Sequence, residues 1–183
     1  MRCFIAVEVP KEIKDYLFEL QGKLSSGRFA KINWVHKKNL HITLKFLGEI
    51  DEGKAEDVKT ALKGVRFSKF RLRLNELGFF PDASKPKVVW IGLDPQIPLM
   101  ELQLDVDGAI REYFPSEGSF KAHLTLGRVR FIKKKSEFRS LADKTKIERL
   151  PFEVESFKLV KSVLSKEGPK YETIEEFRAA GNE

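Results

Sequence analysis

The sequence has one cysteine, Cys3, and no long apolar run. A single cysteine excludes an internal disulfide and any metal cluster held by several cysteines. No stretch approaches the ~18 apolar residues that a membrane-spanning helix needs, so no membrane partner is expected. Asparagine and glutamine are also scarce, and this composition is typical of proteins from hot environments.

Charged residues are numerous and unbalanced. Lys and Arg number 34 against 27 Asp and Glu, which gives a formal net charge of +7. An excess of positive charge favours encounter with polyanions such as nucleic acids through long-range attraction. Ordinary solubility charge is the alternative explanation, and composition alone does not separate the two.

The length of 183 residues suits one compact domain or two small fused lobes. The opening "MRCFIAVEVPKEI" has acidic residues and a proline directly after its apolar part and no small-residue cleavage site. It therefore predicts a first strand and a cytoplasmic protein. No Ser-rich or Gly-rich linker divides the chain, so we expect a single bilobal domain over residues 1–183.

Apolar periodicity and turn residues predict mixed helices and strands. Asp51 is expected to cap a helix, and Gly64 to end it. Helices are expected after Pro10 and over residues 51–62, 98–113 and 134–145, and strands over 3–9, 32–36, 40–48, 69–77, 87–93, 122–131, 152–164 and 170–178.

Two of the strands carry the same tetrapeptide pattern, His-x-Thr-Leu, as "HITL" at 41–44 and "HLTL" at 123–126. The histidines at positions 41 and 123 are 82 residues apart, close to half the chain. This spacing predicts a pseudo-symmetric α+β fold, in which two lobes with antiparallel sheets each contribute one motif to a central cleft and helices cover the outside. Beyond the motif the halves share little sequence, so an internal duplication is only suggested.

Side chains alternate between the faces of a strand. His41, Thr43 and Lys45 are therefore expected on one face, and Leu44 and Phe46 on the apolar face. In the second motif, the histidine and the threonine are likewise expected on one face of the strand. A single His-x-Thr in a strand is most often half-buried structure, but two copies in apolar strands of a basic chain favour a shared site.

Two imidazoles and two hydroxyls suit the cleavage of a phosphodiester. One histidine can activate the attacking oxygen while the other protonates the leaving oxygen, each role being worth roughly 10²- to 10⁴-fold in rate. The threonine hydroxyls can donate hydrogen bonds to the phosphate oxygens as charge develops. This chemistry requires no metal or cofactor. The third histidine, His36, has no partner threonine and is expected to be a solvated residue at a strand end.

A zinc site on His41 and His123 is a competing explanation. Zinc takes three or four ligands at recognisable spacings, and the sequence contains no HxxxH, HExxH or CxxC pattern. The metal-independent interpretation is therefore preferred.

The paired motifs resemble those of the two-histidine phosphodiesterase superfamily, and most closely its branch of RNA 2′,3′-cyclic phosphodiesterases, also called 2′-5′ RNA ligases. Similar flanking segments extend over nearly the whole chain: "RCFIAVEVP", "INWVHKKNLHITLKFLGEI", "KPKVVWIGL" and "FKAHLTLGRVR". The resemblance implies a bilobal fold, no cofactor, and hydrolysis of a 2′,3′-cyclic phosphate at an RNA end, with tRNA as one candidate, to a 2′-phosphomonoester. We expect a monomer.

The resemblance also implies roles for individual residues. His41 would protonate the departing 3′ oxygen, and His123 would activate water. Thr43 and Thr125 would hold the phosphate. Arg128 matches a basic position after the second motif, but strict alternation would point it toward the core unless a bulge near Gly127 redirects it.

Other residues have weaker claims to RNA contact. Lys45 is a candidate at the rim of the cleft, and Phe79, Phe80 and Tyr113 are candidates to stack on a base. A basic cluster that follows the second motif is a candidate to follow an RNA backbone, although a solvated face is the default for such a run; it consists of Arg128, Arg130, Lys133, Lys134, Lys135 and Arg139.

Three functions remain open on the sequence. The first is the cyclic phosphodiesterase. The second is the reverse reaction at the same site, a ligase that joins RNA halves through a 2′-5′ bond. The third is a noncatalytic protein that binds RNA ends. Small cyclic nucleotides, such as ADP-ribose 1″,2″-cyclic phosphate, are further candidate substrates.

Overall fold

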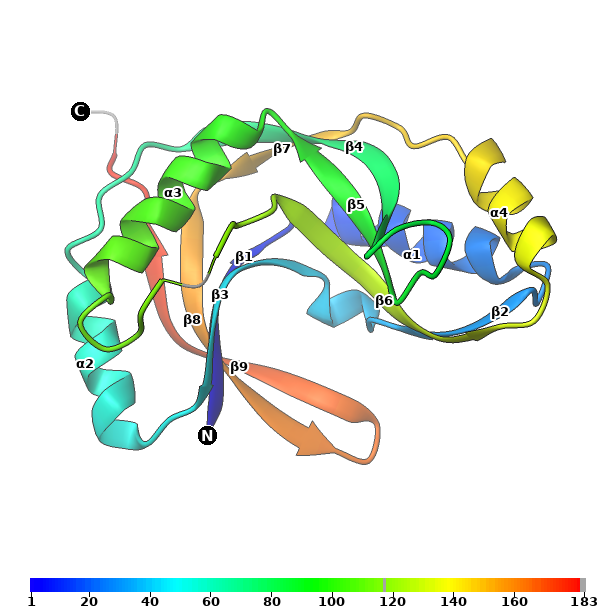
Figure 1. Ribbon diagram of the computed structural model, residues 1–183. Coiled ribbons are helices and arrows are strands. Elements are labelled where there is room, and N and C mark those ends of the chain that lie inside the picture. Colours follow the sequence, from blue (N-terminus) through cyan, green and yellow to red (C-terminus); the bar gives the residue numbers. More distant parts are fainter. Residues whose placement is uncertain (117, 182–183) are drawn as a thin grey trace.

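Two antiparallel sheets and four α-helices make up the computed structural model, which describes residues 1–116 and 118–181 (Figure 1). The elements are β1 (Arg2–Glu8), α1 (Lys11–Ser25), β2 (Ala30–Trp34), the 3₁₀ helix η1 (Lys37–Asn39), β3 (His41–Glu49), α2 (Glu52–Leu62), β4 (Phe70–Phe80), β5 (Val88–Asp94), α3 (Gln96–Ala109), β6 (His123–Ile132), α4 (Lys135–Lys144), β7 (Pro151–Val154), β8 (Ser156–Ser165) and β9 (Gly168–Arg178). The expected α+β class is confirmed.

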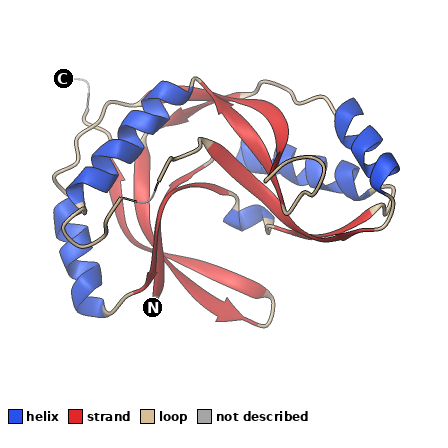
Figure 2. Cartoon of the chain, in the orientation of Figure 1, coloured by secondary structure: helices blue, strands red, loops and turns tan. Residues whose placement is uncertain are grey.

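The strands follow the order β3-β1-β8-β9 in the first sheet and β2-β6-β5-β4-β7 in the second. Every neighbouring pair is antiparallel. The helices lie on the outside of the two curved sheets (Figure 2). β3 and β6, which carry the two motifs, belong to different sheets but contact each other. The two histidines therefore approach one another from opposite sheets.

Local sequence explains the helices. In α1 the buried residues Ile13, Leu17, Leu20 and Leu24 recur every three or four positions and form one apolar face. Asp51 caps α2 as expected, because its carboxylate accepts a hydrogen bond of 2.7 Å from the backbone N–H of Lys54. α3 ends at Ala109, four residues before the expected end at 113, since Ile110 leaves the helical conformation.

The strand expected over residues 152–164 is two strands, and this expectation was wrong. β7 pairs with β4 in one sheet, whereas β8 pairs with β1 and β9 in the other. Phe152 and Val154 are buried, and so are Phe157 and Leu159. The alternation thus slips by one residue at Glu155, where the chain crosses between the sheets.

Both sheets share one hydrophobic core. It contains Ile5 of β1, Leu17 of α1, Leu72 of β4, Leu99 of α3 and Leu124 of β6, none more than 1% exposed. Strands from both ends of the chain pack together in the first sheet, so the ends of the chain stabilise the strand that carries the first motif. No helix of the described part of the chain is long and apolar enough to cross a membrane.

Candidate active site

His41 is the first residue of β3, and both of its ring nitrogens have partners. Nδ1 lies 2.6 Å from the carbonyl oxygen of Asn39, and Nε2 lies 2.8 Å from Oγ1 of Thr43. A carbonyl oxygen only accepts, so the proton of the neutral ring is on Nδ1. Nε2 is then the acceptor for the hydroxyl of Thr43.

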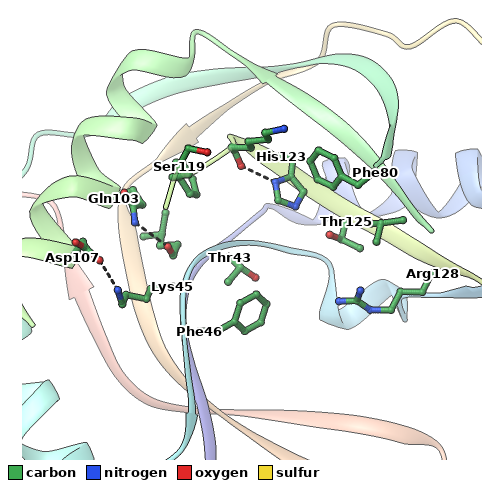
Figure 3. A pocket seen from close by; sticks show the side chains of 14 residues that line it. Thr43, Lys45, Phe46, Phe80, Gln103, Asp107, Ser119, His123, Thr125 and Arg128 are labelled. Atoms are coloured by element: carbon green, nitrogen blue, oxygen red, sulfur yellow. Dashed lines mark hydrogen bonds and ion pairs between the residues drawn. The ribbon is translucent and has the colours of Figure 1, made fainter. Parts of the chain in front are cut away.

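His123 begins β6 in the same way. Its Nδ1 lies 2.7 Å from the carbonyl oxygen of Lys121, which is again the residue two positions earlier (Figure 3). The two histidines therefore have the same tautomer, held by equivalent backbone contacts. Each leaves Nε2 as the nitrogen that can exchange protons with a substrate.

Aromatic rings pack against each histidine. The ring of His41 lies 5.0 Å from Phe4 and 5.4 Å from Tyr171, both measured between ring centroids. The ring of His123 lies 5.0 Å from Phe80, which in turn stacks on Trp90. Aromatic contacts of this kind fix the planes of the imidazoles.

Burial lowers the pKa of both histidines below the ordinary value. For His41, burial is the largest cause; the hydrogen bond to Asn39 opposes it, and the charges of Lys14 and His123 lower the pKa further. For His123, burial is again the main cause of the lowered pKa; the hydrogen bond to the backbone of Lys121 opposes it, and the charge of the Lys121 side chain lowers the pKa further. Both rings are half-buried, so they remain open to solvent while their neutral forms are favoured.

The two histidines line adjoining cavities. A cavity of about 510 Å³ contains His123, and a second of about 390 Å³ contains His41. Thr43, Thr125 and Arg128 line both cavities. They form one cleft between the sheets, and Figure 3 shows Thr43, Thr125 and His123 around the same space. All five residues that the sequence singled out therefore border one cleft.

β-Bulges occur at the same place in both motif strands. In β3, Thr43 and Lys45 pair with the consecutive residues Ala6 and Ile5, which leaves Leu44 as the extra residue. In β6, Thr125 and Gly127 pair with Trp90 and Val89, which leaves Leu126 as the extra residue. A bulge of this kind interrupts the alternation of side chains.

The bulge in β3 overturns the expected placement of two side chains. Lys45 lines the cavity of His123, but it is buried there and not exposed at the rim: its side chain is 5% exposed, and Nζ lies 2.5 Å from Oδ1 of Asp107 and 3.0 Å from the carbonyl oxygen of Pro115. Phe46, expected in the core, is 61% exposed and lines both cavities. Sequence reasoning missed Phe46 because strict alternation assigned it to the wrong face.

The bulge in β6 turns Arg128 toward the cleft, as the bulge in β3 turns Phe46. The redirection that this residue needs near Gly127 is present, and its guanidinium reaches toward the cleft (Figure 3). Gly127 is required for close packing, because a Cβ there would lie 2.8 Å from side-chain atoms of both Ile32 and Trp34.

The other candidates are dispersed. Phe80 lines the cleft beside His123, whereas Phe79 packs on Phe138 and Tyr113 lies beneath the ammonium group of Lys54. His36 is exposed, as expected. Within residues 1–116 and 118–181, no three His, Cys, Asp or Glu side chains are grouped as metal ligands.

Comparison with known proteins shows which family the chain resembles. Residues 7–90 and 91–171 each match the family described as LigT like Phosphoesterase. Each matched stretch contains one of the two His-x-Thr motifs, and this supports an internal duplication.

Curated relatives match over nearly their full lengths. The chain is 34% identical to an RNA 2′,3′-cyclic phosphodiesterase of Methanocaldococcus jannaschii, over 97% of this chain and 100% of that protein. It is 35% identical to the protein of the same name from Archaeoglobus fulgidus, over 97% and 99%. The Thermotoga maritima protein of that name is 33% identical, over 99% and 97%.

Solved structures share the fold. TT0787 of Thermus thermophilus superposes with a TM-score of 0.78 and 29% identity over the whole of both chains. E. coli LigT, solved in complex with 3′-AMP, superposes with a TM-score of 0.77 over 98% of both chains, at 24% identity. On the family match and the full-length relatives together, the chain belongs to the LigT-like phosphoesterases.

Proposed function

We propose that this protein is a metal-independent RNA 2′,3′-cyclic phosphodiesterase, which opens a terminal cyclic phosphate to a 2′-phosphomonoester. The observation that carries the proposal is the pair of histidines with matched tautomers, His41 and His123, whose Nε2 atoms border one cleft with two threonines. The names of the curated relatives support the same activity.

In the proposed reaction, Nε2 of His123 takes a proton from water, and the water oxygen attacks phosphorus. The bond from phosphorus to O3′ breaks as the new bond forms. The protonated Nε2 of His41 gives its proton to O3′, which leaves the phosphate on O2′. Water supplies both the new oxygen and the proton balance, so no other reactant is needed.

Thr43, Thr125 and Arg128 would hold the phosphate. Two hydroxyls and a guanidinium can donate to the nonbridging oxygens, where negative charge accumulates as five oxygens surround phosphorus. When His41 is protonated at Nε2, its contact with Oγ1 of Thr43 reverses, and the hydroxyl hydrogen becomes available to the phosphate.

The partner and setting follow from the same site. Both motifs come from one chain, which supports a single bilobal domain over residues 1–183 that acts as a monomer. An RNA substrate would be met in the cytoplasm, which is the setting that we propose. The RNA would be one that carries a 2′,3′-cyclic phosphate, with tRNA halves as one candidate.

Ligation is the second candidate function. The cleft continues on both sides of the threonines, with one cavity beside each histidine, and this leaves room for a second RNA end. A 5′-hydroxyl in place of water would then attack phosphorus and form a 2′-5′ bond. Incubating an RNA with a cyclic end, with and without a 5′-hydroxyl partner, separates hydrolysed from joined products.

The deciding test is the turnover of an oligonucleotide that ends in a 2′,3′-cyclic phosphate, measured in EDTA. His41→Ala and His123→Ala should each lower kcat by at least about 10²- to 10⁴-fold, because each removes one proton-transfer role. Lys63→Ala, a change of an exposed residue that lines neither cavity of the cleft, is the control. Unchanged turnover in either active-site variant would favour a noncatalytic binding protein. Loss of the parent's activity in EDTA would favour the zinc-site explanation instead.

A further inference from the structure

A second groove continues from the cleft along the outer half of β6. It has a volume of about 670 Å³, and its lining includes five basic residues and no carboxylate. The basic residues are Lys85, Lys87, Arg128, Arg130 and Lys135. We call this feature the β6 groove.

The β6 groove forms where β5 and β6 separate. β5 begins at Val88, which pairs with Arg128 of β6, and the carbonyl of Lys87, just before β5, accepts a hydrogen bond of 2.9 Å from the N–H of Val129. Beyond this point the loop between β4 and β5 leaves the sheet (Figure 1). It carries Lys85 to one side of the groove, while β6 supplies the floor.

The groove and the cleft are continuous. Arg128 lines the β6 groove and both cavities beside the histidines. Asn33 of β2, which is paired with Arg128 in the sheet, lines both the groove and the His41 cavity. The groove therefore adjoins the cleft at Arg128 and Asn33, where a polymer whose end lies between the histidines would enter it.

The basic side chains of the groove do not form close ion pairs with the carboxylates that the structure describes, although Asp82 feels the charge of Lys85. In the part of the chain that the structure describes, none of the five basic side chains forms an ion pair. The contrast is a cavity of about 810 Å³ near the start of α1, where Lys14 and Lys158 both pair with Glu8. The β6 groove thus concentrates basic side chains that form no ion pairs with the described residues, beside the candidate active site.

The groove also offers an aromatic surface. Phe131 lines it and is 49% exposed, with Nζ of Lys133 lying 5.8 Å from its ring centroid. Exposed aromatics among basic side chains are typical of surfaces that bind single-stranded nucleic acid, in which cations meet phosphates and rings meet bases.

We propose that the β6 groove holds the RNA strand on the 5′ side of the cyclic phosphate, by contacts to its backbone phosphates. The inference rests on the proposed function, because a 2′,3′-cyclic phosphate lies at a 3′ end and the rest of the strand must leave the cleft in one direction. Charge complementarity selects this groove as the exit. Backbone contacts carry little sequence information, so the protein should accept ends of varied sequence.

The test compares a 2′,3′-cyclic mononucleotide with an octanucleotide that has the same cyclic end. A triple variant, Lys85→Gln with Arg130→Gln and Lys135→Gln, removes three charges of the groove and spares Arg128. We expect its KM for the octanucleotide to rise by about tenfold or more, and the slope of log KM against log salt to fall by about 2, near 0.7 for each lost contact. Turnover of the mononucleotide should not change.

The matched control removes three charges elsewhere. Lys63, Arg66 and Lys69 are exposed between α2 and β4 and line none of the cavities described above. Their change to glutamine lowers the net charge equally and should leave the KM for the octanucleotide within about twofold, since distant surface charges are screened over ~10 Å at ordinary salt. An equal rise in KM for both triple variants would overturn the proposal, because net charge alone would explain it.

Failure of the groove and failure of the proposed function give different results. If the parent enzyme is active and the groove variant has an unchanged KM for the octanucleotide, only the proposed role of the groove is overturned. Loss of mononucleotide turnover in the groove variant also overturns it, since the damage would then lie in the cleft. If the parent hydrolyses neither substrate, the function fails, and fluorescence anisotropy with an octanucleotide ending in a 2′-phosphate still tests the groove through the salt slope of binding.

Discussion

Phe46 and Arg128 occupy equivalent positions in the two motif strands. Each lies five residues after its histidine and two residues after a bulge, and each lines both cavities of the cleft. The two motif strands thus place different side chains at equivalent positions, an apolar ring from β3 and a cation from β6. Such a pair suits an asymmetric ligand, with a phosphate on one side and a flat base on the other.

Phe46 is therefore expected to stack on the base next to the cyclic phosphate. Phe46→Ala should raise the KM of a cyclic mononucleotide roughly 5- to 150-fold, the equivalent of about 1–3 kcal/mol for one stacked base. The free energy of unfolding should change little, because the ring is 61% exposed. Phe18→Ala, at a ring 55% exposed outside the cleft, is the control. A KM that rises equally in both variants, or in neither, would contradict base stacking.

The sequence predicts the reactive groups of the site better than their surroundings. His41 and Thr43 share a face because alternation over two residues depends only on the local strand, and the same holds for His123 and Thr125. Alternation fails at the next residues, where the bulge at Leu44 reverses the faces. A bulge is set by pairing with a partner strand, which no local pattern of β3 contains.

Long-range pairing also hides the β6 groove from the sequence. The basic run after the second motif is visible, yet Lys85 and Lys87 join it only because β5 pairs with β6 and then departs. The change in the alternation of buried side chains at Glu155 can be seen in the sequence, since Phe152 and Phe157 are an odd number of residues apart. It could have predicted the crossing between sheets.

Lys45 and Asp107 form a buried pair that joins β3 to α3, and breaking it should destabilise the protein. Lys45→Met leaves the carboxylate buried without its main partner, at a cost of about 3–5 kcal/mol in the free energy of unfolding. The double variant Lys45→Met with Asp107→Leu should recover much of this loss, because no charge is left unpaired. Urea unfolding of all three proteins measures it. A double variant as unstable as the single one would show that the pair itself contributes the stability.

The same pair predicts a loss of stability in acid. Burial alone would raise the pKa of Asp107, but hydrogen bonds from Lys45 and Ser116 outweigh it and hold the pKa below its ordinary value. A carboxylate with a lowered pKa stabilises the fold above the ordinary value of about 3.9, and the contribution is lost as pH falls below it. Urea midpoints between pH 3 and pH 6 should therefore fall in acid for the parent, and more weakly for the double variant.

The lowered pKa values of the histidines predict an acidic optimum for kcat/KM. One imidazole must be protonated and the other neutral, and both titrate below the ordinary value of about 6.5 in the free enzyme. Log kcat/KM should thus decline as pH rises from about 6.5 to 8, with a slope approaching −1. An alkaline limb that begins above about pH 7.5 would contradict the burial of the acid.

The same profile assigns the roles of the histidines. Tyr171→Ala removes a ring that buries His41, so the pKa of His41 should rise. If His41 is the acid, this variant moves the alkaline limb to higher pH and leaves the acidic limb in place. Phe80→Ala, which exposes His123, should move the acidic limb instead. The opposite pattern would exchange the two roles.

Gly127 lets β2 pack closely on β6 at the bulge that directs Arg128 into the cleft. In Gly127→Ala, the new Cβ would lie 2.8 Å from the side chains of Ile32 and Trp34 and 3.0 Å from the carbonyl oxygen of Asn33, so β2 must shift. Overpacking of this kind costs about 1–3 kcal/mol in the free energy of unfolding.

The shift should also misplace Arg128, so KM for the cyclic phosphate should rise in Gly127→Ala beyond what the loss of stability explains. The control is Gly108→Ala in α3, where the added Cβ would meet no atom within 4 Å apart from its chain neighbours and the backbone of its own helix, and a helical alanine should raise stability by up to about 1 kcal/mol. Thermal unfolding and steady-state kinetics at about 25 °C compare the two. A Gly127→Ala protein with lower stability but parental KM would show that the bulge does not position Arg128 for the substrate.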